Sequence, residues 1–267
     1  MASLFERDTA VVEIGAGRYR GQMSPNWWIV RGPNGGYIAA MLTTAIKHVA
    51  PDRPVRSLTV HYLAPPREGD VDFVVTVERT GRQFTFVSAR MLQGDRVMAT
   101  AMAACSQSLP GPIFCDVEMP KVAEPLMIPP LGSADEAPDA PMRRNYDMRP
   151  AIGPLPGEHD PTSTKVGGWI RLADREGARP YDERLLVALC DAWPPVMFSR
   201  CETRNPVPTI DLTVHIRQLP TAEDEWFLAV FRSNTVVDGF VEENGEIWTI
   251  DGRLIAQSRQ LALVIPD

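Results

Sequence analysis

The sequence predicts an α+β protein of two similar halves, each made of one buried helix followed by a run of antiparallel strands. The first observation is a repeat, since Leu-Thr-Val-His occurs at residues 58–61 and again at residues 212–215, 154 residues later. The second is a looser match at nearly the same spacing, between residues 95–99 and 252–256. Self-similarity at one spacing is the signature of a duplicated domain.

The first half opens its regular pattern with residues 37–46, a segment that is apolar on every side. Asn34 is a suitable N-cap for this helix, and two glycines at 35 and 36 form its first turn. A helix with no polar face until Lys47 and His48 is expected to be buried all round. Strands are expected after it at residues 71–77, 82–93 and 97–107, where apolar residues alternate with polar ones.

The second half repeats this order after a proline-rich interruption. The expected domains are residues 1–109, a linker over 110–141 that its many prolines keep free of helix and central strand, and residues 142–267. A curved sheet wrapped around its own helix satisfies each half; this geometry is the hotdog, and the whole chain is expected to be a double hotdog. Two unrelated α+β domains are the alternative, which the repeat makes less favourable. The elements expected in the second half are a helix over 185–190 with Asp182 as its cap, and strands over 145–152, 168–172, 209–217, 226–231, 239–243, 246–250 and 254–264.

Composition excludes several classes of function. The net charge of −7 over 267 residues argues against a nucleic-acid surface, which requires a basic face. The absence of an apolar run of about 18 residues predicts no membrane span. The four cysteines have neither zinc-site spacing nor the density of a disulfide scaffold, so reduced thiols in a cytoplasmic protein are expected, with no metal and no cofactor. The four are Cys105, Cys115, Cys190 and Cys201.

Three polar residues of the second half are candidates for chemistry. Asp191 follows five aliphatic residues and a cysteine, at the C-terminal end of a helix expected to be buried. Burial and the helix dipole both disfavour a charged carboxylate there, so Asp191 is either satisfied by hydrogen bonds for structural reasons or kept for chemistry. Thr209 begins a strand and Gln260 lies in the last strand. Taken alone, these two residues favour ordinary strand roles.

The order of these residues resembles the TesB-like (type II) double-hotdog acyl-CoA thioesterases. In that family an Asp at the end of the second helix, a Thr or Ser opening the next strand and a Gln near the chain end orient the attacking water. Asp191, Thr209 and Gln260 match these positions in order and approximate spacing. Two segments of the first half also resemble the family, namely residues 32–37 at the helix entry and residues 57–63 in the following strand.

The resemblance implies hydrolysis of an acyl-CoA to free acid and CoA, without metal or covalent intermediate. Asp191 would accept the proton of water, and N–H groups near Gly35, Gly36 and Tyr37 would hold the developing oxyanion. Two alternatives stay open: a non-catalytic acyl-CoA binding or sensing protein, and a hydratase. The hydratase is disfavoured because no histidine closely follows Asp191. Exposed sheet edges lead us to expect a homodimer or higher homo-oligomer.

Overall fold

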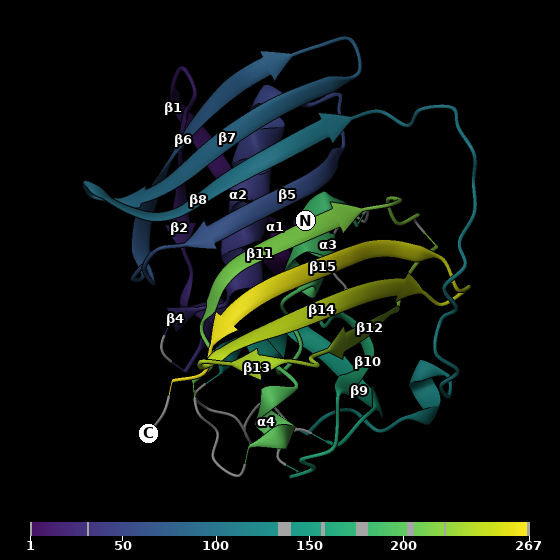
Figure 1. The fold of residues 1–267 in the computed structure, drawn as a ribbon. Helices are drawn as coiled ribbons and strands as arrows, with labels where there is room; N and C mark the ends of the chain where they lie inside the picture. Colours follow the sequence, from purple (N-terminus) through teal and green to yellow (C-terminus); the bar gives the residue numbers. More distant parts are fainter. Residues whose placement is uncertain are drawn as a thin grey trace.

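The fold is one continuous antiparallel sheet with two central helices packed on it, seen in the computed structural model of the chain (Figure 1). The structure describes residues 2–30, 32–132, 140–155, 158–174, 181–201, 206–221 and 223–265. The strands follow the order β1-β2-β6-β7-β8-β5-β11-β15-β14-β12-β10-β9, and the short β13 pairs with β14. The first six strands of this order come from the first half of the chain and the last six from the second, so each half forms its own curved sheet.

Each half contains one long or central helix and a set of strands that occupy matching places in the sheet. In the first half these are α1 Leu4–Asp8, β1 Val11–Gly15, β2 Arg18–Met23, η1 Pro25–Trp27, β3 Trp28–Ile29, β4 Gly32–Pro33, α2 Gly35–Val49, β5 Val55–Tyr62, β6 Gly69–Thr80, β7 Phe84–Gln93 and β8 Arg96–Ser106. In the second half they are η2 Pro125–Met127, η4 Pro141–Asn145, β9 Tyr146–Ile152, β10 Lys165–Leu172, α3 Glu183–Leu189, α4 Met197–Arg200, β11 Thr209–Ile216, β12 Phe227–Arg232, β13 Val236–Val237, β14 Phe240–Thr249 and β15 Leu254–Leu263.

The repeated Leu-Thr-Val-His segments form the seam between the two halves. Strand β5 pairs with β11 in antiparallel register, so that Thr59 lies opposite Thr213. Their hydroxyl oxygens are 3.0 Å apart and share a hydrogen bond. On either side of this threonine pair, Leu58 lies opposite Val214 and Val60 lies opposite Leu212. The repeat therefore marks a local two-fold relation between the halves, and the predicted double hotdog is confirmed.

The two predicted helices are present with the predicted caps. The side-chain oxygen of Asn34 accepts the N–H of Tyr37 at 3.1 Å, which satisfies one of the free donors at the start of α2. Asp182 accepts the N–H of Arg184 at 2.9 Å in the same way at the start of α3. The body of α2 is buried on all sides, as its apolar sequence predicts.

One predicted boundary in the second half is wrong. Two strands were expected over 239–243 and 246–250, but β14 runs without a break from Phe240 to Thr249. Gly245 lies mid-strand, where a side chain would meet the ring of Phe231 and the hydroxyl of Ser258. This glycine therefore permits close packing inside the sheet, which is a common use of glycine in strands.

The proline-rich linker packs on the outer face of the second sheet. In Figure 1 it leaves the end of β8 and runs down one side of the molecule to η2. Its residues Met119, Val122 and Ile128 pack on a cluster that includes Trp169, and the indole N–H of Trp169 donates to the carbonyl oxygen of Ala123 at 2.8 Å. The outer face of this sheet is thereby shielded from water.

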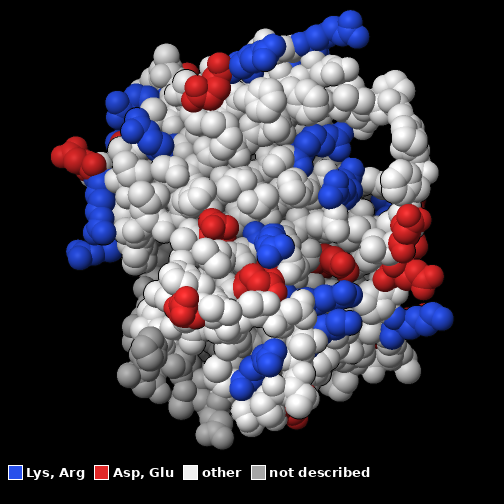
Figure 2. Space-filling model, in the orientation of Figure 1, with Lys and Arg blue, Asp and Glu red and all other residues white. Residues whose placement is uncertain are grey.

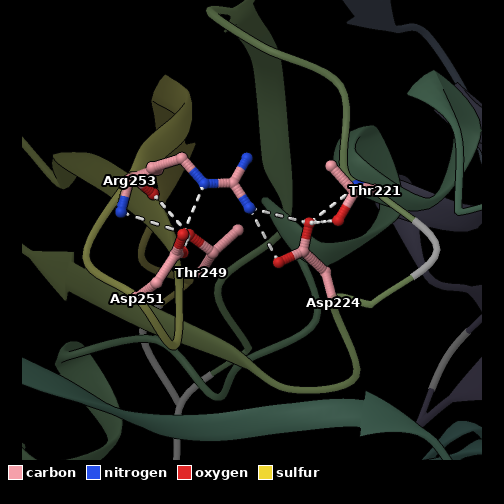
Figure 3. Close-up of polar contacts among 5 residues, drawn as sticks. All are labelled: Thr221, Asp224, Thr249, Asp251 and Arg253. Carbon is pink, nitrogen blue, oxygen red and sulfur yellow. Dashed lines mark hydrogen bonds and ion pairs between the residues drawn. The ribbon is translucent and has the colours of Figure 1, made fainter.

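A polar cluster fixes the turn between β14 and β15 (Figure 3). The guanidinium of Arg253 binds the buried carboxylate of Asp224 at 2.9 Å and that of Asp251 at 2.8 Å.

The rest of the surface shows no single-sign patch of described residues on the face drawn in Figure 2, where acidic and basic side chains are interspersed. The four cysteines are free thiols, as expected. Among the described residues, no helix has the length and apolarity needed to cross a bilayer.

Candidate active site

Asp191 lies directly after α3 and docks on the N-terminus of α2 from the other half. Its Oδ2 accepts the backbone N–H of Gly36 at 2.8 Å and the side-chain N–H of Asn34 at 3.0 Å. The same Asn34 nitrogen donates to the carbonyl oxygen of Asp191 at 2.8 Å. The N-terminus of a helix carries partial positive charge and free N–H donors, so it stabilises an anion. The carboxylate thus has a binding place that the sequence alone did not suggest.

The two helices come very close at this point, and glycine makes the approach possible. A Cβ on Gly36 would lie 2.6 Å from the carbonyl oxygen of Ala188 in α3. A Cβ on Gly35 would lie 2.9 Å from Oδ2 of Asp191. The hydroxyl of Tyr62 donates to the carbonyl oxygen of Gly35 at 2.9 Å, which further fixes the turn. The glycine pair therefore lets α2 present its N–H groups directly to Asp191.

Burial disfavours the charged form of Asp191, whereas several hydrogen-bond donors stabilise it. Burial raises its pKa to about 6, while hydrogen bonds from Gly36, Asn34 and Gly35 act in the opposite direction. Within the described part of the chain, no Lys or Arg lies at ion-pair distance from it. The hydrogen bonds from Asn34 and Gly36 both end on Oδ2. Asp191 is therefore a carboxylate that is more basic than usual and can accept a proton near neutral pH.

Thr209 and Gln260 are brought together by neighbouring strands β11 and β15. The hydroxyl of Thr209 donates to Oε1 of Gln260 at 2.9 Å. Gln260 is buried, with only 7% of its surface exposed, which is unusual for a glutamine. The interpretation of Gln260 as an ordinary solvated strand residue is therefore wrong, because its side chain is buried.

Glu243 on β14 completes the network, and sequence reasoning missed it. Its Oε1 accepts the side-chain N–H of Gln260 at 3.0 Å, and its Oε2 accepts the backbone N–H of Val196 at 2.9 Å. Burial, and to a smaller extent the charge of Asp191, raise the pKa of Glu243 to about 7. The charge of Asp191 therefore acts on the glutamate that binds Gln260. The missed signal was strand period, since Val241 and Ile247 share the inward face of β14 with Glu243.

The N–H groups expected to hold an oxyanion already have protein acceptors. Gly36 donates to Asp191, and Tyr37 donates to the side-chain oxygen of Asn34. The N–H of Gly35 also favours the charged form of Asp191. In the described residues, no group of three or more His, Cys, Asp or Glu side chains is arranged to hold a metal ion.

Two family models match the sequence over most of its length. The Acyl-CoA thioesterase C-terminal domain matches residues 125–264, and the Acyl-CoA thioesterase N-terminal domain matches residues 24–106. The chain belongs to the acyl-CoA thioesterase family. Residues 107–124 separate the two matched ranges and overlap the first part of the proline-rich linker, and Asp191, Thr209 and Gln260 all lie in the range matched by the C-terminal domain.

Two relatives of this chain differ in how much of it they match. An uncharacterized protein of Mycobacterium tuberculosis (strain ATCC 25618 / H37Rv) is 24% identical over 271 residues, covering 92% of this chain and 90% of that protein. Thioesterase-like protein TwmA of Talaromyces wortmannii is 31% identical over 96 residues, which cover 35% of this chain and 28% of TwmA.

Solved structures establish the fold of this family member. A hot dog fold protein of unknown function from Alicyclobacillus acidocaldarius superposes with a TM-score of 0.89 at 24% identity, covering 100% of both chains. The acyl-CoA thioesterase II TesB2 of Mycobacterium marinum superposes with a TM-score of 0.77 at 21% identity, covering 98% of both chains. At these identities the likeness shows a shared fold and leaves the substrate open.

Proposed function

We propose that this chain hydrolyses an acyl-CoA thioester to a free carboxylic acid and CoA, using water activated by Asp191, Thr209 and Gln260. The observation that carries the proposal is the state of Asp191. Burial makes this carboxylate basic, α2 holds it with no cation beside it among the described residues, and its charge acts on Glu243, the hydrogen-bond partner of Gln260. A buried carboxylate with a raised pKa suits a general base near neutral pH.

In the proposed reaction Oδ1 of Asp191 accepts a proton from water while the water oxygen attacks the thioester carbonyl carbon. The resulting tetrahedral intermediate collapses, the carbon–sulfur bond breaks, and CoA leaves as a thiolate that takes up the proton from Asp191. The carboxylate is thereby restored for the next cycle, and no metal or covalent enzyme intermediate enters the scheme. The hydrogen bonds to Oδ2 keep Asp191 fixed throughout.

The turn at Gly35, Gly36 and Tyr37 has two proposed roles. Its contacts with Asp191 and Asn34 support a role in holding the general base. A contribution of the same turn to oxyanion binding stays a prediction. It requires the thioester oxygen to share a donor with Asp191, since the N–H of Gly36 is already engaged.

The experiment that tests the proposal is release of CoA thiol from short-, medium- and long-chain acyl-CoAs. Wild type is compared with Asp191→Asn and with Asp72→Asn, a matched control on β6 in the other half. We expect turnover in wild type and in the control, and a loss of at least about 100-fold in Asp191→Asn. Binding of acyl-CoA without thiol release by wild type would instead identify a non-catalytic binding protein.

A further inference from the structure

A chain of four hydrogen-bonding groups runs from the backbone of Val196 to Thr209. The N–H of Val196 donates to Oε2 of Glu243, the side-chain N–H of Gln260 donates to Oε1 of Glu243, and the hydroxyl of Thr209 donates to Oε1 of Gln260. Glu243 is 5% exposed and Gln260 is 7% exposed, so solvent does not compete for these bonds.

The direction of every bond in this chain follows from its first two members. The N–H of Val196 can only donate, and both oxygens of an ionised Glu243 can only accept. Gln260 must therefore turn its NH₂ group toward Glu243, which turns its oxygen toward Thr209. The hydroxyl of Thr209 must then donate inward. Its lone pairs remain directed outward, available to accept a hydrogen bond from water.

This polarity suits the water of the proposed reaction. With Thr209 and Asp191 both acting as acceptors, each proton of the water has a partner, and both oxygen lone pairs stay free of a Thr209 donor. If the hydroxyl of Thr209 donated outward instead, it would occupy one of these lone pairs and draw electron density from the oxygen. The direction of one buried hydrogen bond thus affects how nucleophilic the water is.

The equivalent positions in the first half of the chain have no such hydrogen-bond network. Thr59 and Thr213 are paired across the seam and occupy equivalent positions in the two halves. The strand register on each side of the seam then identifies the equivalent positions in the neighbouring strands. The first half has buried apolar residues at all three equivalent places. In order, Thr209, Gln260 and Glu243 correspond to Val55, Ala103 and Val87, and Glu243–Gln260 are sheet partners just as Val87–Ala103 are.

The fold thus builds a stable hotdog at these positions with valine and alanine. Burying a glutamate and a glutamine there is costly unless they are paired. We infer that Glu243 is a positioning residue, which fixes the orientation of the Gln260 amide and, through it, the direction in which Thr209 donates. This inference rests on the proposed function for its kinetic consequence, while the orientation of Gln260 is a property of the protein alone.

Glu243→Gln is the sharpest perturbation because it preserves shape and reverses one bond. The new amide must give its oxygen to the N–H of Val196, so its NH₂ group faces Gln260. Gln260 then has to turn its own oxygen toward position 243 and its NH₂ group toward Thr209. The Thr209 hydroxyl becomes the acceptor and points its proton at the water.

The kinetic test compares Glu243→Gln with Glu242→Gln, the neighbouring carboxylate, which binds the N–H of Asn234 outside this network. We expect kcat to fall about 10- to 100-fold in Glu243→Gln with KM changed little, and both to be unchanged in Glu242→Gln. In a Gln260→Ala background, Glu243→Gln should lower kcat less than about twofold, because its effect passes through Gln260. An equal loss in both backgrounds would overturn the inference.

A second measurement needs no substrate. In protein labelled with ¹⁵N at glutamine side chains, the NH₂ resonances of Gln260 are assigned by their loss in Gln260→Ala. They should shift in Glu243→Gln and stay in place in Glu242→Gln, at a pH of 8, where Glu243 is ionised. Unmoved Gln260 resonances would refute the positioning role even if hydrolysis were found. A shift in an inactive chain would refute only the proposed function.

Discussion

Asp191→Asn should make the protein more stable at neutral pH while removing its proposed activity. Burial raises the pKa of Asp191 from 3.8 to about 6 in the folded state. The protonated carboxyl is therefore favoured by folding, and its stabilising contribution is complete below about pH 4. That contribution is lost as the pH rises through about 6, because the folded state must then hold a buried charge. Asparagine has no charge to lose and keeps an oxygen for the N–H groups of Asn34 and Gly36.

The size of the effect follows from the pKa shift. A shift of about two units, at 1.36 kcal/mol each, gives an upper bound of about 3 kcal/mol. Partial exposure of Asp191 and the weaker hydrogen bonds of a neutral amide reduce this value, so we expect about 1–3 kcal/mol at pH 8. For a chain of this size, each kcal/mol raises the melting temperature by about 2–4 °C.

The assay is thermal unfolding of wild type and Asp191→Asn at several pH values between 4 and 8. The difference in melting temperature should be near zero at pH 4, grow between pH 4 and 6, and stay constant above about pH 7. Asp72→Asn is a control of opposite sign, because its hydrogen bond to Arg20 lowers the pKa of Asp72. Removing that carboxylate should reduce stability at neutral pH, and the reduction should fade as the pH drops below about 4.

Two results would refute this reasoning. If Asp191→Asn were less stable than wild type at pH 8, the hydrogen bonds from α2 would outweigh the cost of burial. If it were more stable by the same amount at pH 4 and pH 8, the gain would come from packing rather than from charge.

Three further predictions concern activity, helix packing and the linker. The kcat/KM for thioester hydrolysis should rise with pH between about 6 and 7, as Asp191 and then Glu243 ionise; an activity that is flat between pH 5 and 8 would argue against Asp191 as the base. Gly36→Ala should lower the free energy of unfolding by about 1–3 kcal/mol in denaturant titrations, because its Cβ would lie 2.6 Å from the carbonyl oxygen of Ala188; wild-type stability would show that the helices separate freely. Trp169→Phe should cost about 1 kcal/mol and speed protease cleavage of the linker, because it loses the hydrogen bond to Ala123; unchanged cleavage would mean that apolar packing alone holds the linker.

The sequence predicted the parts of the fold that have strong periodicity or repeat. Both helices and their caps were predicted correctly, because α2 and α3 have more apolar residues than a helix on the protein surface would have. The hairpin of β1 and β2 was missed, because no strand was predicted before the first helix. Tyr19, Gly21 and Met23 do alternate with polar residues on β2, so the signal was present but short. The predicted break between residues 243 and 246 is wrong, and the glycine inside it, Gly245, allows close packing within a continuous strand.

The candidate site was only partly predictable because its contacts join distant parts of the chain. The resemblance supplied Asp191, Thr209 and Gln260 as residue types in order. The hydrogen bond from Gly36 to Asp191 spans 155 residues and depends on how the two helices meet. The strand period of β14 could have indicated that Glu243 faces inward, but its pairing with Gln260 follows from the register of β14 and β15.

The helices α2 and α3 meet a carboxylate at each end of their contact, and only one of these carboxylates suits the proposed role of general base. At one end, Asp191 is held by N–H dipoles and has no cation beside it among the described residues. At the other end, Glu183 at the start of α3 forms an ion pair with Lys47 of α2 at 3.3 Å and accepts the N–H of Val55. The charge of Glu183 is matched by a lysine, whereas the charge of Asp191 is stabilised by hydrogen-bond donors alone among the described residues. Duplication thus supplied two similar junctions between the helices. One is closed by an ion pair, and the other keeps a carboxylate whose charge remains available to a substrate.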